Sequence, residues 1–208
     1  MNNVRDALTI RRIIKVNHAG EHGAIQIYSA QIAVARWLYP DIVAILREML
    51  GHEISHRAKF RAAMPPRTAR PCRIMQLWSI GGWLLGLVTA IMGRRSIWIC
   101  TAAVEEAVHR HLDDQLQFLI VRDPDLHDII ATIRVEELSH LHHAQSQLPP
   151  ELGLAARTLM CSITLATDVL IWLSTWGDST DEARDANGPL DLHPPIQRID
   201  GDHEIDAR

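Results

Sequence analysis

Apolar residues recur at helical spacing along most of positions 1–177, and clusters of proline, glycine and aspartate interrupt them. Runs in which apolar and polar residues alternate, as in a half-buried strand, are few. This pattern favours an all-α fold. It predicts six helices, at about residues 8–38, 41–63, 75–93, 95–121, 124–147 and 151–176.

The breaks between these helices have local causes. Pro40, in the segment Tyr39-Pro40-Asp41, should end one helix and begin the next, because proline lacks an amide hydrogen and disfavours helix in the residue before it. Asp123 is a suitable N-cap and Pro124 a suitable first residue for the fifth helix. Further prolines at 65, 66, 71, 149 and 150 separate the remaining segments.

Two halves of the helical region carry the same set of metal-binding residue types. The first half contains Glu21, Glu53 and His56, and the second contains Glu105, Glu137 and His140. In each half 32 positions separate the two glutamates, and the histidine follows the second glutamate by three. Each half is predicted to be an antiparallel hairpin whose two ligand positions lie about 16 residues from the turn, roughly 24 Å along each arm.

Glutamate and histidine at i and i+3 share one face of a helix. Two such hairpins packed together would surround one point with four carboxylates and two imidazoles, as a dinuclear site in a four-helix bundle requires. Each metal would take one histidine and one terminal glutamate, and two glutamates would bridge. These ligands suit iron or manganese, and four buried negative charges would need metal to offset them. A single Glu-x-x-His pair also arises by chance, but its duplication favours an oxygen-using di-iron enzyme.

Length and charge indicate how many domains the chain contains and where its helical part ends. A chain of 208 residues fits one domain with a substantial core. Nine acidic residues and three arginines give positions 178–208 a formal charge of −6, so positions 1–177 sum to +2. We predict a helical domain at 1–177 and a disordered acidic tail at 178–208. The three cysteines form no CxxC motif and indicate reduced thiols, the first twelve residues do not resemble a signal peptide, and nothing indicates nucleic-acid binding.

The segment 77–92 is uncharged, contains three glycines and is flanked by arginines at 73, 94 and 95. It is slightly short for a membrane span, and a span there would place the two halves of the metal site on opposite sides of a bilayer. We therefore expect a helix at the membrane interface or, equally, a buried core helix. The last helix is also apolar, but Arg157 and Asp168 argue against spanning. Basic residues between 57 and 73 could face anionic lipid or line a solvated linker.

The His18-Ala19-Gly20-Glu21 segment resembles the demethoxyubiquinone hydroxylase family of ubiquinone biosynthesis. The similarity continues at Glu53 and His56, at Val104-Glu105-Glu106 with His111, and at Glu136-Glu137-Leu138-Ser139-His140. It covers roughly residues 10 to 176, and the combination of motifs is specific although each motif alone is not.

The resemblance implies a ferritin-like four-helix bundle, with additional apolar helices, that holds two iron ions. The implied ligands are Glu21, Glu53, His56, Glu105, Glu137 and His140. It also implies O2-dependent hydroxylation of the ring of a membrane-borne demethoxyubiquinone, with electrons from an external reductant such as NADH. Family position suggests a catalytic role for His111, either supporting the metal ligands or on the substrate side, although a histidine packed between helices is an equal alternative. The next residue, tyrosine in many members, is Leu112 here.

The resemblance further implies a peripheral membrane protein on the cytoplasmic face of a bacterial inner membrane, or on the mitochondrial inner membrane in a eukaryote. A homo-oligomer or a complex with other ubiquinone-biosynthesis proteins is compatible with it. Among the neighbouring residues, Glu106 and Glu136 are predicted to face solvent, and His18, His22 and His52 are predicted not to be ligands.

Two other functions fit parts of the pattern. A ferritin-like or rubrerythrin-like iron oxidase or peroxidase would use the same six ligands, but it does not need a long uncharged helix flanked by arginines. A non-enzymatic, membrane-associated assembly protein would not need the duplicated ligand set. Bound metal would distinguish either enzyme from the assembly protein. Turnover of a quinone would distinguish the hydroxylase from the iron oxidase or peroxidase.

Overall fold

The computed structural model describes residues 2–175, and these residues form helices and no strand. The six α-helices are α1 (Asn2–Leu38), α2 (Val43–Ala63), α3 (Met75–Met92), α4 (Arg94–Leu119), α5 (Pro124–Ser146) and α6 (Leu154–Thr175). Short 3-10 helices, η1 (Pro40–Ile42) and η2 (Pro65–Arg67), follow α1 and α2. The prediction of an all-α fold is confirmed, and the predicted tail at 178–208 lies outside the described residues.

The helix boundaries agree with the sequence prediction except at two starts. α1 begins at Asn2 rather than near residue 8, because positions 2–7 contain no proline or glycine to prevent helix. α6 begins at Leu154, after Gly153 and two prolines, rather than near 151. The predicted cap of α5 is present, since the backbone amide of Leu126 donates to Asp123 Oδ1 at 3.1 Å and Pro124 follows as the first helical residue.

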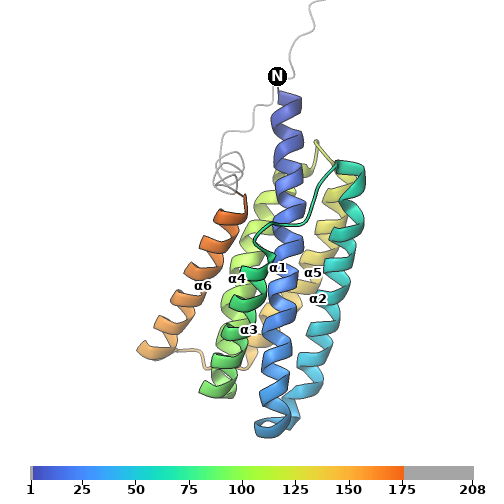
Figure 1. The fold of residues 1–208 in the computed structure, drawn as a ribbon. Coiled ribbons are helices and arrows are strands. Elements are labelled where there is room, and N and C mark those ends of the chain that lie inside the picture. Colours follow the sequence, from blue (N-terminus) through green and yellow to red (C-terminus); the bar gives the residue numbers. More distant parts are fainter. Residues whose placement is uncertain (1, 176–208) are drawn as a thin grey trace, which may run out of the picture.

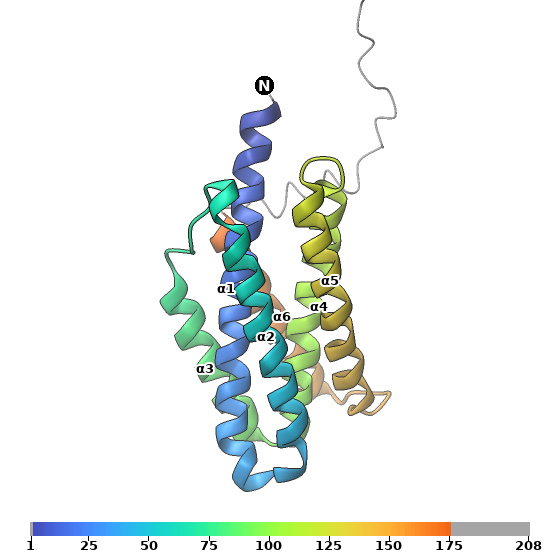
Figure 2. The same cartoon turned by 90° about the vertical axis from the view of Figure 1, so that its right-hand side faces the viewer.

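Two antiparallel hairpins form the central bundle, one from α1 and α2 and the other from α4 and α5 (Figures 1 and 2). Buried apolar residues cluster at each end of this bundle. Leu46, Met49 and Trp98 belong to one cluster, and Phe60 and Ile130 belong to the other. The predicted ligand positions fall between the two clusters along every helix, so the apolar packing holds them at one level.

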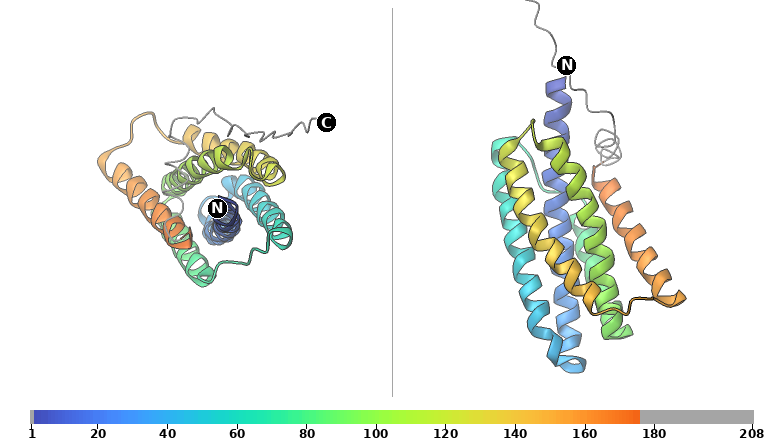
Figure 3. Two further views of the ribbon diagram at one scale, coloured as in Figure 1. Left: turned by 90° about the horizontal axis from the view of Figure 1, so that it is seen from above. Right: turned by 180° about the vertical axis from the view of Figure 1, so that it is seen from behind.

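α3 and α6 lie outside the four-helix bundle, on the side formed by α1 and α4 (Figure 3). α3 approaches α1 very closely: a Cβ on Gly82 would stand 2.5 Å from the carbonyl oxygen of Gly23, and one on Gly86 would collide with the carbonyl oxygen of Ile27. These glycines therefore let α3 pack along α1, and the two halves of the ligand set are not separated by it.

Two described helices, α3 and α6, are long and apolar enough to cross a membrane by length and composition alone. One side of each packs on the bundle, and the other is exposed. The exposed apolar side chains on these helices are Leu77, Ile80, Trp83, Leu84, Val88, Ile91, Met92, Leu154, Leu165, Val169, Trp172 and Leu173. We call this set the apolar outer face.

Candidate metal centre

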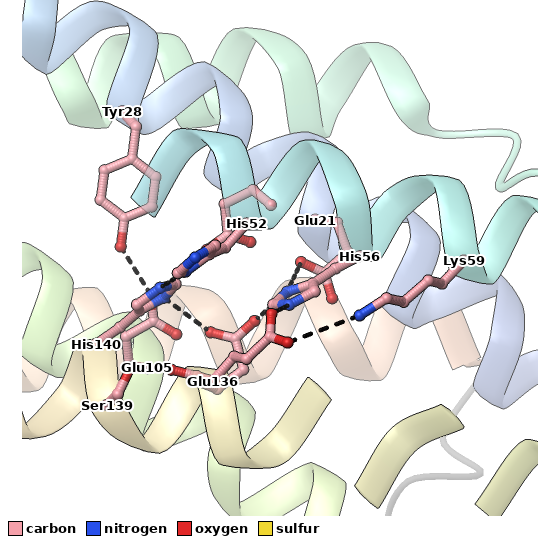
Figure 4. A network of polar contacts seen from close by, with 11 residues as sticks. Glu21, Tyr28, His52, His56, Lys59, Glu105, Glu136, Ser139 and His140 are labelled. Carbon is pink, nitrogen blue, oxygen red and sulfur yellow. Dashed lines mark hydrogen bonds and ion pairs between the residues drawn. The ribbon is translucent and has the colours of Figure 1, made fainter. Parts of the chain in front are cut away.

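Four helices bring the six predicted ligand residues together in the middle of the bundle (Figure 4). α1 supplies Glu21, α2 supplies Glu53 and His56, α4 supplies Glu105, and α5 supplies Glu137 and His140. All six residues are buried, and the most accessible is Glu21 at 7%. The equal spacing in the two halves therefore does place the side chains at the same depth.

The six side chains form two overlapping groups, each able to hold one metal ion. The first group contains Glu21 and His56, the second contains Glu105 and His140, and both contain Glu53 and Glu137. Within each group the candidate ligand atoms lie within 4.8 Å of one another. This geometry matches the predicted dinuclear arrangement, in which each position has one histidine and one terminal glutamate and two glutamates are shared.

Both histidines turn the same ring nitrogen toward the carboxylates. His56 Nδ1 lies 2.8 Å from Glu137 Oε1 and 3.8 Å from Glu21 Oε2. His140 Nδ1 lies 3.4 Å from Glu137 Oε2 and 3.5 Å from Glu53 Oε1. The Nδ1 atoms are thus directed into the space that the carboxylate oxygens surround.

Several of these atoms are buried without a hydrogen-bond partner among the described residues. They are Glu53 Oε1, both carboxylate oxygens of Glu137, and Nδ1 of His56 and of His140. Such atoms cost free energy when buried unless something satisfies them. Carboxylate oxygens and neutral imidazole nitrogens that converge in this way fit a pair of divalent metal ions of the iron or manganese type.

The electrostatics of the metal-free cluster point the same way. Burial, together with the charges of Glu53 and Glu137, raises the pKa of Glu21 well above its ordinary value. The pKa of Glu105 is raised for the same reasons. Burial opposes charge on His140, but the nearby carboxylates of Glu137 and Glu53 outweigh it and raise the pKa of His140 to about 10. Without metal the cluster therefore retains protons that a cation would displace.

The other ring nitrogen of each histidine is held by a residue from the facing helix. His56 Nε2 contacts Glu136 Oε2 at 2.6 Å, and the Lys59 ammonium lies 3.8 Å from the other oxygen of Glu136. His140 Nε2 contacts His52 Nδ1 at 2.9 Å, and these two rings lie nearly parallel. Such partners orient metal-binding histidines and fix which nitrogen carries the proton.

Glu136 faces solvent only in part: its side chain is 35% exposed, and one of its oxygens contacts His56 because α2 crosses α5 at this level. Its counterpart Glu106 is exposed, as predicted. Tyr28 was not predicted at all, although its hydroxyl donates to Glu105 Oε1 at 2.9 Å. Helical spacing could have identified Tyr28 and His52 as neighbours of the site. Tyr28 lies two turns after Glu21, and His52 lies one turn before His56, so each shares a helix face with a predicted ligand.

A cavity of about 390 Å³ adjoins the cluster. Its inner end is formed by the four glutamates, and its walls come from α1, α3, α4 and α6. Its lining is mostly apolar, with Trp78 and Leu85 from α3 and with Ile163, Leu170 and Ile171 from α6. A small apolar molecule with a polar head could reach the carboxylate cluster along this cavity.

His111 also lines the cavity, which places it on the predicted substrate side of the cluster. Its Nε2 lies 3.2 Å from Asp168 Oδ1 on α6, and the guanidinium of Arg110 contacts the same carboxylate at 3.3 Å. His111 is not among the grouped ligands. Asp168 therefore connects α6 to the one histidine in the cavity wall.

Fold and cluster together define a class of protein: a helical bundle whose buried carboxylate and imidazole groups can hold two metal ions beside an apolar cavity. The family model described as "Ubiquinone biosynthesis protein COQ7" matches residues 8–174. The chain belongs to this family, so the resemblance inferred from the sequence motifs is confirmed.

Curated relatives carry hydroxylase names. The mouse "NADPH-dependent 3-demethoxyubiquinone 3-hydroxylase, mitochondrial" is 33% identical over 174 residues, which cover 80% of this chain and 78% of the mouse protein. The "3-demethoxyubiquinol 3-hydroxylase" of Rhodospirillum rubrum is 40% identical over 134 residues, 64% of this chain and 63% of that protein. By these relationships the chain is an enzyme of the oxidoreductase class, a hydroxylase.

Proposed function

We propose that this protein hydroxylates the ring of a demethoxyubiquinone intermediate, using O2 and a di-iron centre held by Glu21, Glu53, His56, Glu105, Glu137 and His140. The observation that carries the proposal is the pair of overlapping ligand groups at the inner end of an apolar cavity. The names of the relatives supply the substrate class, since they describe demethoxyubiquinone and demethoxyubiquinol hydroxylases.

The reaction inserts one atom of O2 into a ring C–H bond and reduces the other atom to water, which consumes two electrons and two protons. When bound, the iron pair would supply the electron transfer to O2 that closed-shell organic molecules cannot provide. The mitochondrial relatives are named as NADPH-dependent enzymes, so a reduced nicotinamide is the proposed external electron donor.

The protein's own residues bind and orient the substrate. The apolar walls from α3 and α6 take the isoprenoid tail and exclude water from the reacting ring. His111 lies in the same wall, where its Nε2 is held by Asp168, so it can bind or release a proton at the substrate side of the cluster. We assign His111 this catalytic role.

α3 and α6 line the cavity with one side and expose the apolar outer face with the other. We propose that this face lies in one leaflet of a membrane, so that a lipid quinone enters the cavity without crossing water. We propose peripheral attachment on the cytoplasmic face of a bacterial inner membrane or, in a eukaryote, on the mitochondrial inner membrane, which the names of the mitochondrial relatives support. The apolar outer face also allows contact with a second copy or with another ubiquinone-biosynthesis protein.

A single-turnover assay tests the proposed reaction. The protein is reconstituted with iron, reduced, and exposed to short-tailed demethoxyubiquinone and 18O2. The expected result is a quinone product that has gained one labelled oxygen atom, as measured by mass spectrometry. Glu137→Ala should abolish the product, and Glu106→Ala, which changes the exposed glutamate beside Glu105, should not.

Other outcomes separate the alternatives. A protein that binds two irons and consumes O2 without forming product would support the iron oxidase or peroxidase function. A protein that binds no iron and forms no product would overturn the metal site itself.

A further inference from the structure

The cavity has a further polar corner besides the carboxylate cluster and His111. There the side-chain amides of Asn17 on α1 and Gln115 on α4 face each other. Asn17 Nδ2 donates to Gln115 Oε1 at 2.7 Å, and Gln115 Nε2 donates to Asn17 Oδ1 at 3.2 Å. Gln115 is only 2% exposed. We call these two side chains the amide pair.

The other polar side chains from α3 and α6 that line the cavity have partners elsewhere or lie exposed. Trp78 Nε1 donates to Ser174, and the Thr167 hydroxyl donates to the carbonyl oxygen of Ile163. Ser162 is exposed on α6. In the part of the cavity between His111 and the end of the bundle, the amide pair is thus the buried group that can form hydrogen bonds with a polar ligand.

The amide pair lies close to the candidate metal centre. Asn17 contacts Gln115, and Tyr28, later in α1, contacts Glu105, which is earlier in α4. The two helices therefore run antiparallel. Asn17 precedes Glu21 by four residues, and Gln115 follows His111 by four, so the pair stands one helical turn, about 6 Å, from the level of Glu21. That separation matches the width of a six-membered ring with substituents on both sides.

The hydrogen-bonding capacity of the pair is only half used. Each amide spends one N–H and one carbonyl lone pair on its partner, and keeps one N–H and one lone pair. A quinone ring presents oxygen atoms that only accept hydrogen bonds, whereas the reduced quinol presents hydroxyls that also donate. An amide can serve both forms, and a carboxylate at this position could serve only the quinol.

We propose that the Asn17–Gln115 amide pair binds an oxygen substituent of the quinone ring and so determines which ring carbon faces the metal centre. This inference rests on the proposed function and adds the residues that recognise the head of the substrate. The pair selects the polar ring, while the remaining cavity wall accepts any apolar tail.

The test measures binding by the metal-free full-length protein, so it does not depend on turnover. Two probes are compared by equilibrium dialysis: a short-tailed demethoxyubiquinone and a benzene that carries the same tail without ring oxygens. The wild type should prefer the quinone. Gln115→Met keeps the side-chain length but removes the amide, and should weaken quinone binding about tenfold while leaving the hydrocarbon probe unchanged.

Ser162→Ala, which removes a hydroxyl from the opposite wall, is the matched control and should keep the full preference for the quinone. If Gln115→Met keeps that preference too, the amide pair is only a structural bracket between α1 and α4 and the proposal is wrong. If the wild type itself binds neither probe, the cavity does not take a quinone, and the proposed function fails together with this inference.

A second variant covers the case in which Gln115→Met does not fold. Asn17 is only partly buried, so Asn17→Asp should be tolerated. It replaces both N–H donors of Asn17, the one bonded to Gln115 Oε1 and the free one, by acceptors, and it should weaken binding of the quinone while sparing the quinol. Equal affinities for both oxidation states, unchanged from wild type, would overturn the proposal.

Discussion

At the scale of single residues, the candidate metal centre depends on partners outside the ligand set. Each histidine is fixed from the facing helix, His56 by a carboxylate and His140 by an imidazole. A carboxylate makes the bound imidazole more electron-rich than a neutral ring does. The two candidate metal positions are therefore chemically unequal, although the sequence motif that builds them is repeated.

Glu136→Gln tests this outer contact. The variant keeps the shape of the side chain but removes the charge that His56 Nε2 meets at 2.6 Å. Affinity for Mn²⁺ at the His56 position should fall roughly 10- to 100-fold, as measured by isothermal titration. Because the Glu136 side chain is 35% exposed, the fold should be retained. Glu106→Gln is the control, and equal affinities in the two variants would show that Glu136 does not act through His56.

At the scale of elements, the sequence predicts the four bundle helices well and the outer two only in part. The breaks at Pro40 and Pro124 are local signals that determine where each hairpin turns. The repeated ligand spacing then indicates which positions of its two helices lie opposite each other. The placement of α3 is not local. It depends on Gly82 and Gly86 meeting the α1 backbone, and an apolar segment with three glycines is equally compatible with a helix at the membrane interface or a core helix.

Gly86→Ala should therefore destabilise the protein. Its added methyl group would collide with the carbonyl oxygen of Ile27, so α3 must move off α1. Overpacking of this kind costs about 1–3 kcal/mol, measurable by chemical denaturation. Gly81→Ala on the same helix meets nothing within 4 Å, and it should leave stability unchanged or raise it by up to about 1 kcal/mol. Similar losses in both variants would contradict close packing as the cause.

The apolar outer face gives a prediction for α3 and α6 together. Leu84 and Val169 are about half exposed, at 49% and 47%, so replacing each with aspartate should not disturb the core. A charge placed at the edge of the hydrocarbon layer of a membrane costs several kcal/mol. Most of the double variant should therefore fail to co-sediment with phospholipid vesicles. Val135→Asp, on the exposed side of α5, should bind vesicles like the wild type. Unchanged binding by the double variant would exclude this face as the membrane contact.

At the scale of the whole molecule, the cluster of ligands was predictable and its surroundings were not. All six residues of the site follow from one repeated spacing and from the geometry of a helix, and they do converge. Tyr28, His52 and Glu136 required the distances between α2, α4 and α5, which depend on side-chain packing throughout the bundle. The cavity likewise arises only when α6, the last helix, closes against α1 and α4.

Both the stability of the metal-free bundle and its affinity for metal should depend on pH. The metal-free fold holds protons on Glu21 and Glu105, whose pKa values are raised, so it loses stability as pH rises above their ordinary values. The stability that protonated His140 contributes is present below its ordinary pKa and is lost as pH rises toward about 10, in the same direction. A bound metal displaces these protons, so its affinity increases with pH.

The melting temperature of the Mn²⁺-loaded protein should therefore exceed that of the EDTA-treated protein by a margin that grows between about pH 6 and pH 8. At a metal concentration a hundredfold above Kd, binding contributes about 2.7 kcal/mol, which corresponds to roughly 5–10 °C for a domain of this size. Glu137→Ala removes a candidate ligand common to both metal positions, and its melting temperature should not respond to Mn²⁺ at any pH in this interval. A margin in the wild type that shrinks with rising pH would contradict the displacement of protons from Glu21, Glu105 and His140 by the metal.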